Sequence, residues 1–164
     1  MGSIQEFVQT YSPQSEARIV FAWNGKHAAE FADENMVFRQ SVCDYFEANK
    51  EATPLPLIAA LYNAETLFAK EAWGVNGVVS ELAQELLERG GVNYIDAYIA
   101  GAARGMDAYM ESGNIRLSQA RCRELLVHCQ TCVENGSESD KNRWGMFVAR
   151  FSHLLQASQA QRTP

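Results

Sequence analysis

Apolar residues recur at helical spacing along nearly the whole of this 164-residue chain, and no stretch keeps up the alternation of apolar and polar residues that marks a half-buried strand. Short segments rich in Gly, Pro, Asn or Ser separate the periodic stretches, at 12–13, 24–25, 53–56, 74–76, 90–91, 112–114 and 135–137. The sequence therefore predicts an all-α fold. We expect a single-domain bundle of six or seven amphipathic helices joined by short turns over residues 1–158, and a frayed tail over 159–164.

In the first half of the chain, the expected helices are set by their breakers. The apolar run 17–23 ends at Asn24-Gly25, a dipeptide that could also close a hairpin, but the residues after it show no strand pattern, so a helix is preferred. Apolar residues at steps of three, four and seven predict an amphipathic helix over about 27–49. Pro54 and Pro56 then indicate the start of a helix that ends near Trp73-Gly74.

The second half repeats this organisation with clearer caps. Asn76 is placed to cap a helix that Gly90-Gly91 stops, with a buried stripe of Val79, Leu82 and Leu86. A further helix is expected from about 116 or 117 to 134. Ser137 and Asp140 form an approximate capping box for a last helix that reaches about residue 158.

Residues 92–111 are expected to form the central helix. Beside its large apolar residues runs a stripe of small ones, namely Ala97, Gly101, Gly105 and Ala108. Each glycine inside a helix costs about 1 kcal/mol relative to alanine, so a compensating close approach of a second backbone is predicted.

Charge narrows the possible partners. The formal net charge is −6, and the field of the whole molecule should repel nucleic acid and anionic membranes. Residues 1–111 carry 7 basic against 16 acidic residues, whereas 112–164 carry 7 against 4. The start of the chain, 1–7, has neither the basic residues nor the apolar run of a signal peptide, which predicts a cytoplasmic protein.

The chemistry-bearing residues give few catalytic signals, because the chain contains no GxGxxG, P-loop, GxSxG or HExxH motif. Weak candidates for a metal or redox site are Cys122, His128, Cys129 and Cys132. Steps of seven and three place the three sulfurs on the expected core face of their helix, near its C-terminal end, where the helix dipole raises a thiol pKa. We therefore expect buried thiols, no metal and no cofactor.

A basic stripe is the candidate partner surface. On the last two helices it comprises Arg116, Arg123, Arg143, Met146, Arg150 and His153. Its charged groups suit an acidic surface or a phosphate, although a solvated helix face would look the same.

The resulting functional hypothesis is a small acidic protein-binding regulator, adaptor or inhibitor, for example a toxin-neutralising factor, that binds another protein or a second copy of itself and has no catalytic site. Large apolar residues that fall off the main stripes support it, namely Tyr62, Trp73, Leu87 and Met146. The alternative is a helical domain that binds a small molecule or uses a metal or thiol for catalysis. It would have a pocket beside residues 92–111 lined by Tyr94, Tyr98, Arg104 and Tyr109.

Overall fold

The computed structural model describes residues 3–72 and 74–160, and it confirms the all-α class. Within these ranges there is no β-strand, and only one isolated bridge, between Trp23 and Asp33, pairs extended segments. The α-helices are α1 (Ile4–Gln9), α2 (Met36–Ala48), α3 (Leu55–Ala72), α4 (Val78–Gly90), α5 (Ile95–Ala102), α6 (Met106–Gly113), α7 (Gln119–Asn135) and α8 (Glu138–Ala160). Short 3-10 helices cover Pro13–Arg18, Ala28–Glu30, Lys50–Ala52 and Gly91–Asn93. The described residues thus hold eight α-helices rather than six or seven.

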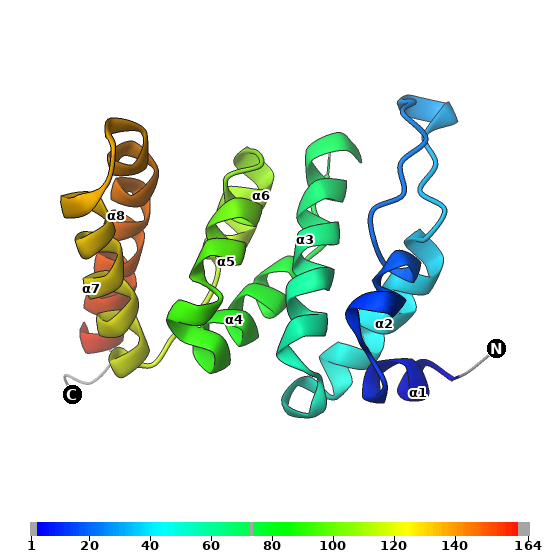
Figure 1. The fold of residues 1–164 in the computed structure, drawn as a ribbon, viewed down its shortest axis with the longest axis horizontal. Coiled ribbons are helices and arrows are strands. Elements are labelled where there is room, and N and C mark those ends of the chain that lie inside the picture. The colour runs from blue at the N-terminus through cyan, green and yellow to red at the C-terminus, as the bar shows by residue number, and fades with distance from the viewer. Residues whose placement is uncertain (1–2, 73, 161–164) are drawn as a thin grey trace.

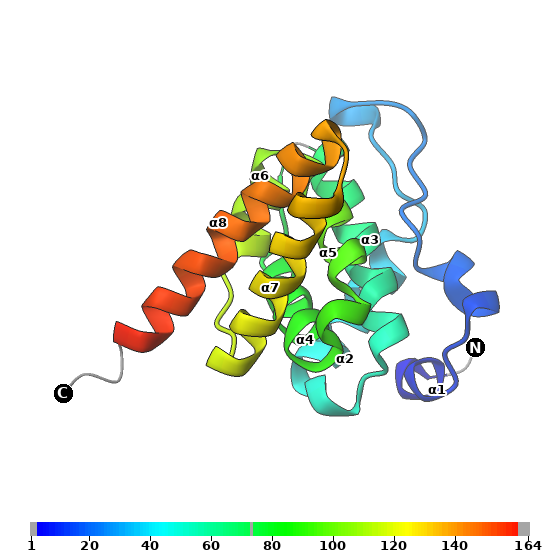
Figure 2. The same ribbon diagram turned by 60° about the vertical axis from the view of Figure 1, so that its left-hand side comes forward.

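The helices follow one another along the longest axis of the molecule (Figure 1). The first two helices and the loop that joins them lie at one end, and the paired helices α7 and α8 lie at the other. Figure 2 shows α7 and α8 side by side, with the end of α8 extending past its neighbours. One cluster of buried apolar side chains runs from Phe7 in α1 to Phe151 in α8 and joins these ends.

The helices α3 and α4 form where the sequence predicts them, but the N-cap of α4 is Gly77 and not Asn76. The side chain of Asn76 accepts from the Val78 backbone N–H at 3.4 Å. Helix α3 begins at Leu55, directly after Pro54, and α4 buries Val79, Leu82 and Leu86 completely. It stops where Gly91 takes a φ of 56°, a left-handed conformation that glycine adopts without strain. The predicted end of α3 near Trp73 falls at a residue outside the described ranges.

The C-terminal pair forms close to the predicted boundaries, although α7 begins at Gln119, two or three residues after the expected start. The hydroxyl of Ser118 caps α7, and Ser137 and Asp140 exchange the hydrogen bonds of a capping box before α8. Helix α8 continues to Ala160, two residues beyond the expected end at 158, and the rest of the predicted tail, 161–164, lies outside the described residues.

The N-terminal prediction was wrong, because residues 17–23 form no α-helix and α2 begins at Met36 rather than near His27. The reason is the turn chemistry of Asn24. Its carboxamide oxygen accepts hydrogen bonds from the backbone N–H groups of Lys26 and Ala32, and its NH₂ group donates to the Glu30 carbonyl. Local bonds of this kind compete with the helix for the same backbone groups. They hold residues 19–35 as a loop whose backbone extends beyond α2 (Figure 1), while the rings of Phe21 and Phe31 pack against Phe68 of α3.

A buried ion triad attaches this loop to the helices. The guanidinium of Arg39 in α2 donates to Asp33 Oδ2 at 2.7 Å and to Glu65 Oε1 of α3 at 2.6 Å, and all three side chains are at most 3% exposed. Asp33 Oδ1 accepts from the Ala22 backbone N–H at 3.0 Å. Burial by itself lowers the pKa of Arg39, but the hydrogen bonds and charges of the two carboxylates outweigh it and raise that pKa, so the guanidinium stays charged.

The prediction of one central helix over 92–111 was also wrong. The chain leaves the helix at Ala103 and re-enters it at Met106, so two helices, α5 and α6, replace one. Gly101 is buried against the ring of Tyr62, which a Cβ would strike, so a side chain and not a second backbone makes the close approach. Gly105 lies in the break, where a Cβ would meet nothing.

Two expectations about apolar surface have different outcomes. Tyr62 and Leu87 are fully buried and present no interface, whereas Met146 is 50% exposed; Trp73 lies outside the described ranges. In the part of the chain that is described, no helix is long and apolar enough to cross a membrane.

Candidate functional site

The break between α5 and α6 creates the first surface feature of interest. Arg104, inside the break, turns its guanidinium onto α3 and donates to the Asn63 carbonyl at 2.5 Å and to Thr66 Oγ1 at 2.6 Å. The backbone N–H of Ala103 still bonds the Ile99 carbonyl, and that of Arg104 bonds the Gly101 carbonyl, so α5 ends in a tightened turn. The guanidinium bonds then join this break to the middle of α3.

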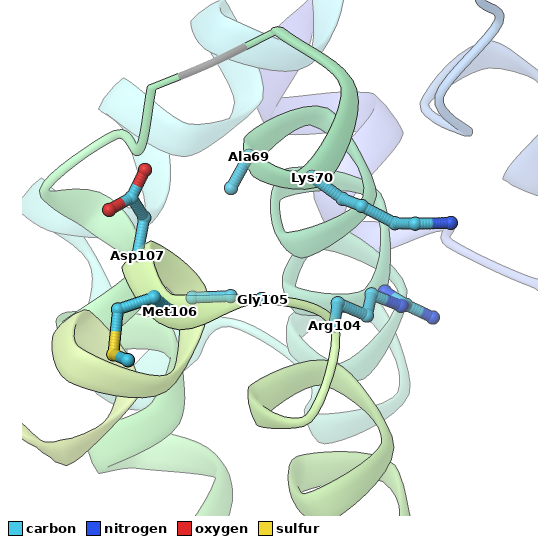
Figure 3. Close-up of a pocket in the computed structure, with 7 residues that line it drawn as sticks. Ala69, Lys70, Arg104, Gly105, Met106 and Asp107 are labelled. Carbon is cyan, nitrogen blue, oxygen red and sulfur yellow. The ribbon is translucent and has the colours of Figure 1, made fainter.

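A cavity of about 270 Å³ lies at this junction (Figure 3). Its lining residues come from α3, the break and the first turn of α6: Ala69, Lys70, Arg104, Gly105, Met106, Asp107 and Ala108. In the view of Figure 3, Lys70 and Arg104 extend to one side and Met106 to the other. The cavity is therefore lined by two positive charges, one negative charge and a thioether.

Helix α6 exposes two methionines one turn apart. Met106 is 74% and Met110 is 64% exposed, and Met146 on α8 is 50% exposed. Among the described residues, the only other large apolar side chains exposed to this degree are Val37 and Val127. Methionine is flexible and polarizable and is over-used at surfaces that adapt to a partner.

A second cavity, of about 250 Å³, lies between α6 and α8. It is lined by Tyr109, Met110, Gly113, Arg150, His153 and Leu154. Met106 and Met110 thus belong to cavities on α6 that face α3 and α8 respectively, and we call Met106, Met110 and the two cavities the methionine face.

Arg150 joins α8 to α5 and α6 through hydrogen bonds. Its guanidinium donates to the Tyr98 hydroxyl at 2.7 Å and to the Tyr109 carbonyl at 2.6 Å, and it lies 3.7 Å from the centroid of the Tyr109 ring. The Tyr98 hydroxyl in turn donates to the Ser112 carbonyl at 3.0 Å. Burial raises the pKa of Tyr98 to about 12, although the positive charge of Arg150 opposes this. Two of the five N–H donors of Arg150 are thus used inside the fold.

The other members of the predicted basic stripe lie on the surface but are not all gathered in one place. Arg123 is exposed on α7, and the backbone of exposed Arg116 bonds the side chain of Gln84 on α4. Arg143 is exposed on α8 with its guanidinium 4.0 Å from Asp96. Of the stripe, Arg150 and His153 line the second cavity together, and Met146 lies one turn before Arg150 on α8.

The predicted pocket residues are also divided. Arg104 lines the first cavity and Tyr109 the second, whereas Tyr98 is fully buried and Tyr94 packs beside Gly90. A single pocket lined by all four is therefore absent from the described residues.

The thiols lie as the helical spacing predicts. Cys122 and Cys129 are fully buried, and burial raises the pKa of Cys129 to about 12. Cys132 is half-buried, with its sulfur 3.6 Å from His128 Nε2. In the described part of the chain, no group of three or more His, Cys, Asp and Glu side chains is arranged to hold a metal ion.

The ion triad was not predicted from the sequence, although the position of Arg39 in an apolar stripe indicated it. Arg39 shares the buried face of α2 with Val42, Cys43 and Phe46, at steps of three, four and seven. A charged residue in the middle of an apolar stripe indicates a buried partner of opposite charge, and only the fold identifies Asp33 and Glu65 as those partners.

Comparisons with protein-family models, with curated proteins and with solved structures give no match to this chain.

Proposed function

We propose that the protein is a protein-binding helical module whose methionine face receives an apolar segment of a partner. The observation that carries this proposal is the exposure of Met106 and Met110, one turn apart on a short helix between two cavities. Two large apolar side chains in water lose the free energy that burial provides, about 1.5–3 kcal/mol for each when fully buried. An interface recovers that energy.

Charge indicates the chemistry of the partner. The first cavity carries Lys70 and Arg104 against Asp107, and the second carries Arg150 beside His153. Both cavities are net positive on a chain whose total charge is −6. A segment with apolar side chains for the methionines and acidic side chains for the rim complements this surface.

The module would act as a regulator, adaptor or inhibitor in the cytoplasm, and its partner would be another protein or a second copy of the chain. The four cysteines support a reducing compartment, since none of them is in a disulfide and two are fully buried. The remaining stripe residues, Arg116, Arg123 and Arg143, would contribute only if the partner extends past the methionine face onto α7 and the start of α8.

The test is a native mass spectrum of the chain isolated gently from its own cells, in three forms: the natural chain, Met106→Glu with Met110→Glu, and Val37→Glu. Val37 is 73% exposed on α2, which lies at the end of the molecule opposite α7 and α8 and apart from α6 (Figure 1), so its substitution is a matched control. We expect a bound polypeptide with the natural chain and the control, and its loss from the double variant. A natural chain that carries no polypeptide, or a double variant that keeps it, would overturn the proposal.

A small-molecule site beside residues 92–111 is the second candidate function. It is favoured by the first cavity, but a volume of about 270 Å³ falls below the usual range of ligand pockets, about 300–1,000 Å³. A mass surplus of a few hundred daltons, lost on Met106→Glu, would replace the first proposal with this one.

A further inference from the structure

The ion triad has a formal charge that its own members do not balance. It contains two carboxylates, Asp33 and Glu65, and one guanidinium, Arg39, so its net charge is −1. A buried charge of this kind is costly unless it is paired. The two oxygens of Asp33 are both used, one by Arg39 and the other by the backbone N–H groups of Ala22 and Asn35.

The unused acceptor is therefore on Glu65. Its Oε1 pairs with Arg39, whereas its Oε2 accepts no hydrogen bond from any described residue. Glu65 is only 2% exposed. Among the described residues, however, every polar side-chain atom that is fully buried has a hydrogen-bond partner, so the unpartnered Oε2 is not fully buried. Glu65 Oε2 must then reach open space, and Glu65 does line a cavity.

This cavity is distinct from the methionine face. Its volume is about 470 Å³, and it lies between α2, α3 and the segment that follows α3. Met36, Phe68 and Val75 supply apolar walls, and Arg39, Gln40 and Asn76 line it beside Glu65 with polar groups. An adjoining cavity, also of about 470 Å³, shares Met36 and Phe68 with it and continues the apolar wall to Phe31.

The combination of a buried carboxylate oxygen and apolar walls selects one class of ligand. A metal ion would need several oxygen ligands, and this cavity offers one free carboxylate oxygen. Arg39 does not repel a cation here on balance, because the charge of Asp33 offsets its own and leaves that of Glu65. An organic cation carries one positive charge with donors for Glu65 Oε2 and has an apolar body for Met36 and Phe68.

We propose that this cavity binds an organic ammonium or guanidinium group on an apolar stem, with the cation at Glu65 Oε2 and the stem against Met36, Phe68 and Val75. The ligand is either a free amine or a basic side chain of a partner, since both present the same chemistry. The proposal is independent of the methionine face, and neither substitution in α6 should change it.

The test measures binding of two probes of equal shape, 2-phenylethylamine and the neutral 2-phenylethanol, by calorimetry and by amide chemical shifts. We expect the amine to bind at least tenfold more tightly than the alcohol, which is about 1.4 kcal/mol. A blocked Phe-Lys dipeptide amide as a third probe distinguishes the sources. Tighter binding of the dipeptide points to a side chain of a partner, and tighter binding of the amine to a free ligand.

Variants test whether Glu65 is the receiving group. Glu65→Gln should bring the amine and the alcohol to equal affinity. Because this change also touches the triad, Gln40→Lys provides a second route: Gln40 is exposed at the cavity, and a positive charge there should weaken the amine and leave the alcohol unchanged. The matched control is Gln130→Lys, on exposed α7 surface. Equal affinity of the two probes for the natural chain, no binding of any probe at millimolar concentration, or an unchanged amine affinity in Gln40→Lys would overturn the proposal.

Discussion

Replacing Arg39 with methionine tests the central claim about the ion triad. The variant keeps most of the side-chain volume but leaves the carboxylates of Asp33 and Glu65 buried with no cation. All three side chains are at most 3% exposed, so solvent screens little of this interaction. Breaking a buried pair by removing one partner typically costs 3–5 kcal/mol. Against a total stability of about 5–15 kcal/mol for a domain, that is a large fraction.

For a chain of this size, each kcal/mol lowers the melting temperature by about 2–4 °C. We therefore expect Arg39→Met to melt roughly 6–20 °C below the natural chain, measured by circular dichroism at the helix band, with the free energy of unfolding taken from urea titration. Arg123→Met is the matched control, since it removes the same charge from an exposed position on α7, and it should shift stability by at most about 0.5 kcal/mol.

A second variant separates lost charge pairing from lost packing. In the triple change Asp33→Asn, Arg39→Met and Glu65→Gln, no charge remains buried, and much of the lost stability should return. A loss under about 1 kcal/mol in Arg39→Met, or a triple variant no more stable than the single one, would refute the view that the triad is held by its charges.

Three further predictions concern packing and titration. Gly101→Leu should cost about 1–3 kcal/mol, because its side chain strikes the Tyr62 ring; an unchanged melting temperature would contradict that contact. Burial raises the pKa of Cys129 to about 12, so in the native protein Cys132, which is half-buried, should react first with a thiol reagent at pH 8, and equal rates would contradict the burial. Burial also raises the pKa of Tyr98 to about 12, from an ordinary value of 10.0. The titration of Tyr98 should thus leave the free energy of unfolding unchanged below about pH 10 and lower it between about pH 10 and 12. This free energy should fall more steeply with pH in the natural chain than in Tyr98→Phe. Equal slopes in urea titrations of the two proteins would contradict the raised pKa.

The sequence was sufficient wherever caps and stripes agree. Pro54 starts α3, Gly91 stops α4, and Ser137 with Asp140 starts α8, because each of these signals acts within one helical turn. The buried Cys129 follows from the same periodicity. Local signals of this kind require no knowledge of the remaining chain.

The failures share a different cause, which is contact between distant residues. The helix expected over 92–111 breaks where Arg104 bonds Asn63 and Thr66, about 40 residues earlier in the chain. Periodicity cannot reveal that bond, because it describes one helix at a time. Periodicity also could not predict the bonds of Arg150 to Tyr98 and Tyr109, because it placed Arg150 only on a charged face of α8.

The attachment of the 19–35 loop has a consequence for the order of folding. Glu65 lies 26 residues after Arg39 in the chain, so the triad closes only after α2 and α3 have packed together. The loop has no α-helix of its own to form earlier. We expect it to be ordered late, after the folding transition state. Substitutions at Asp33 should then accelerate unfolding and leave the folding rate nearly unchanged, so the triad would determine how long the native state persists.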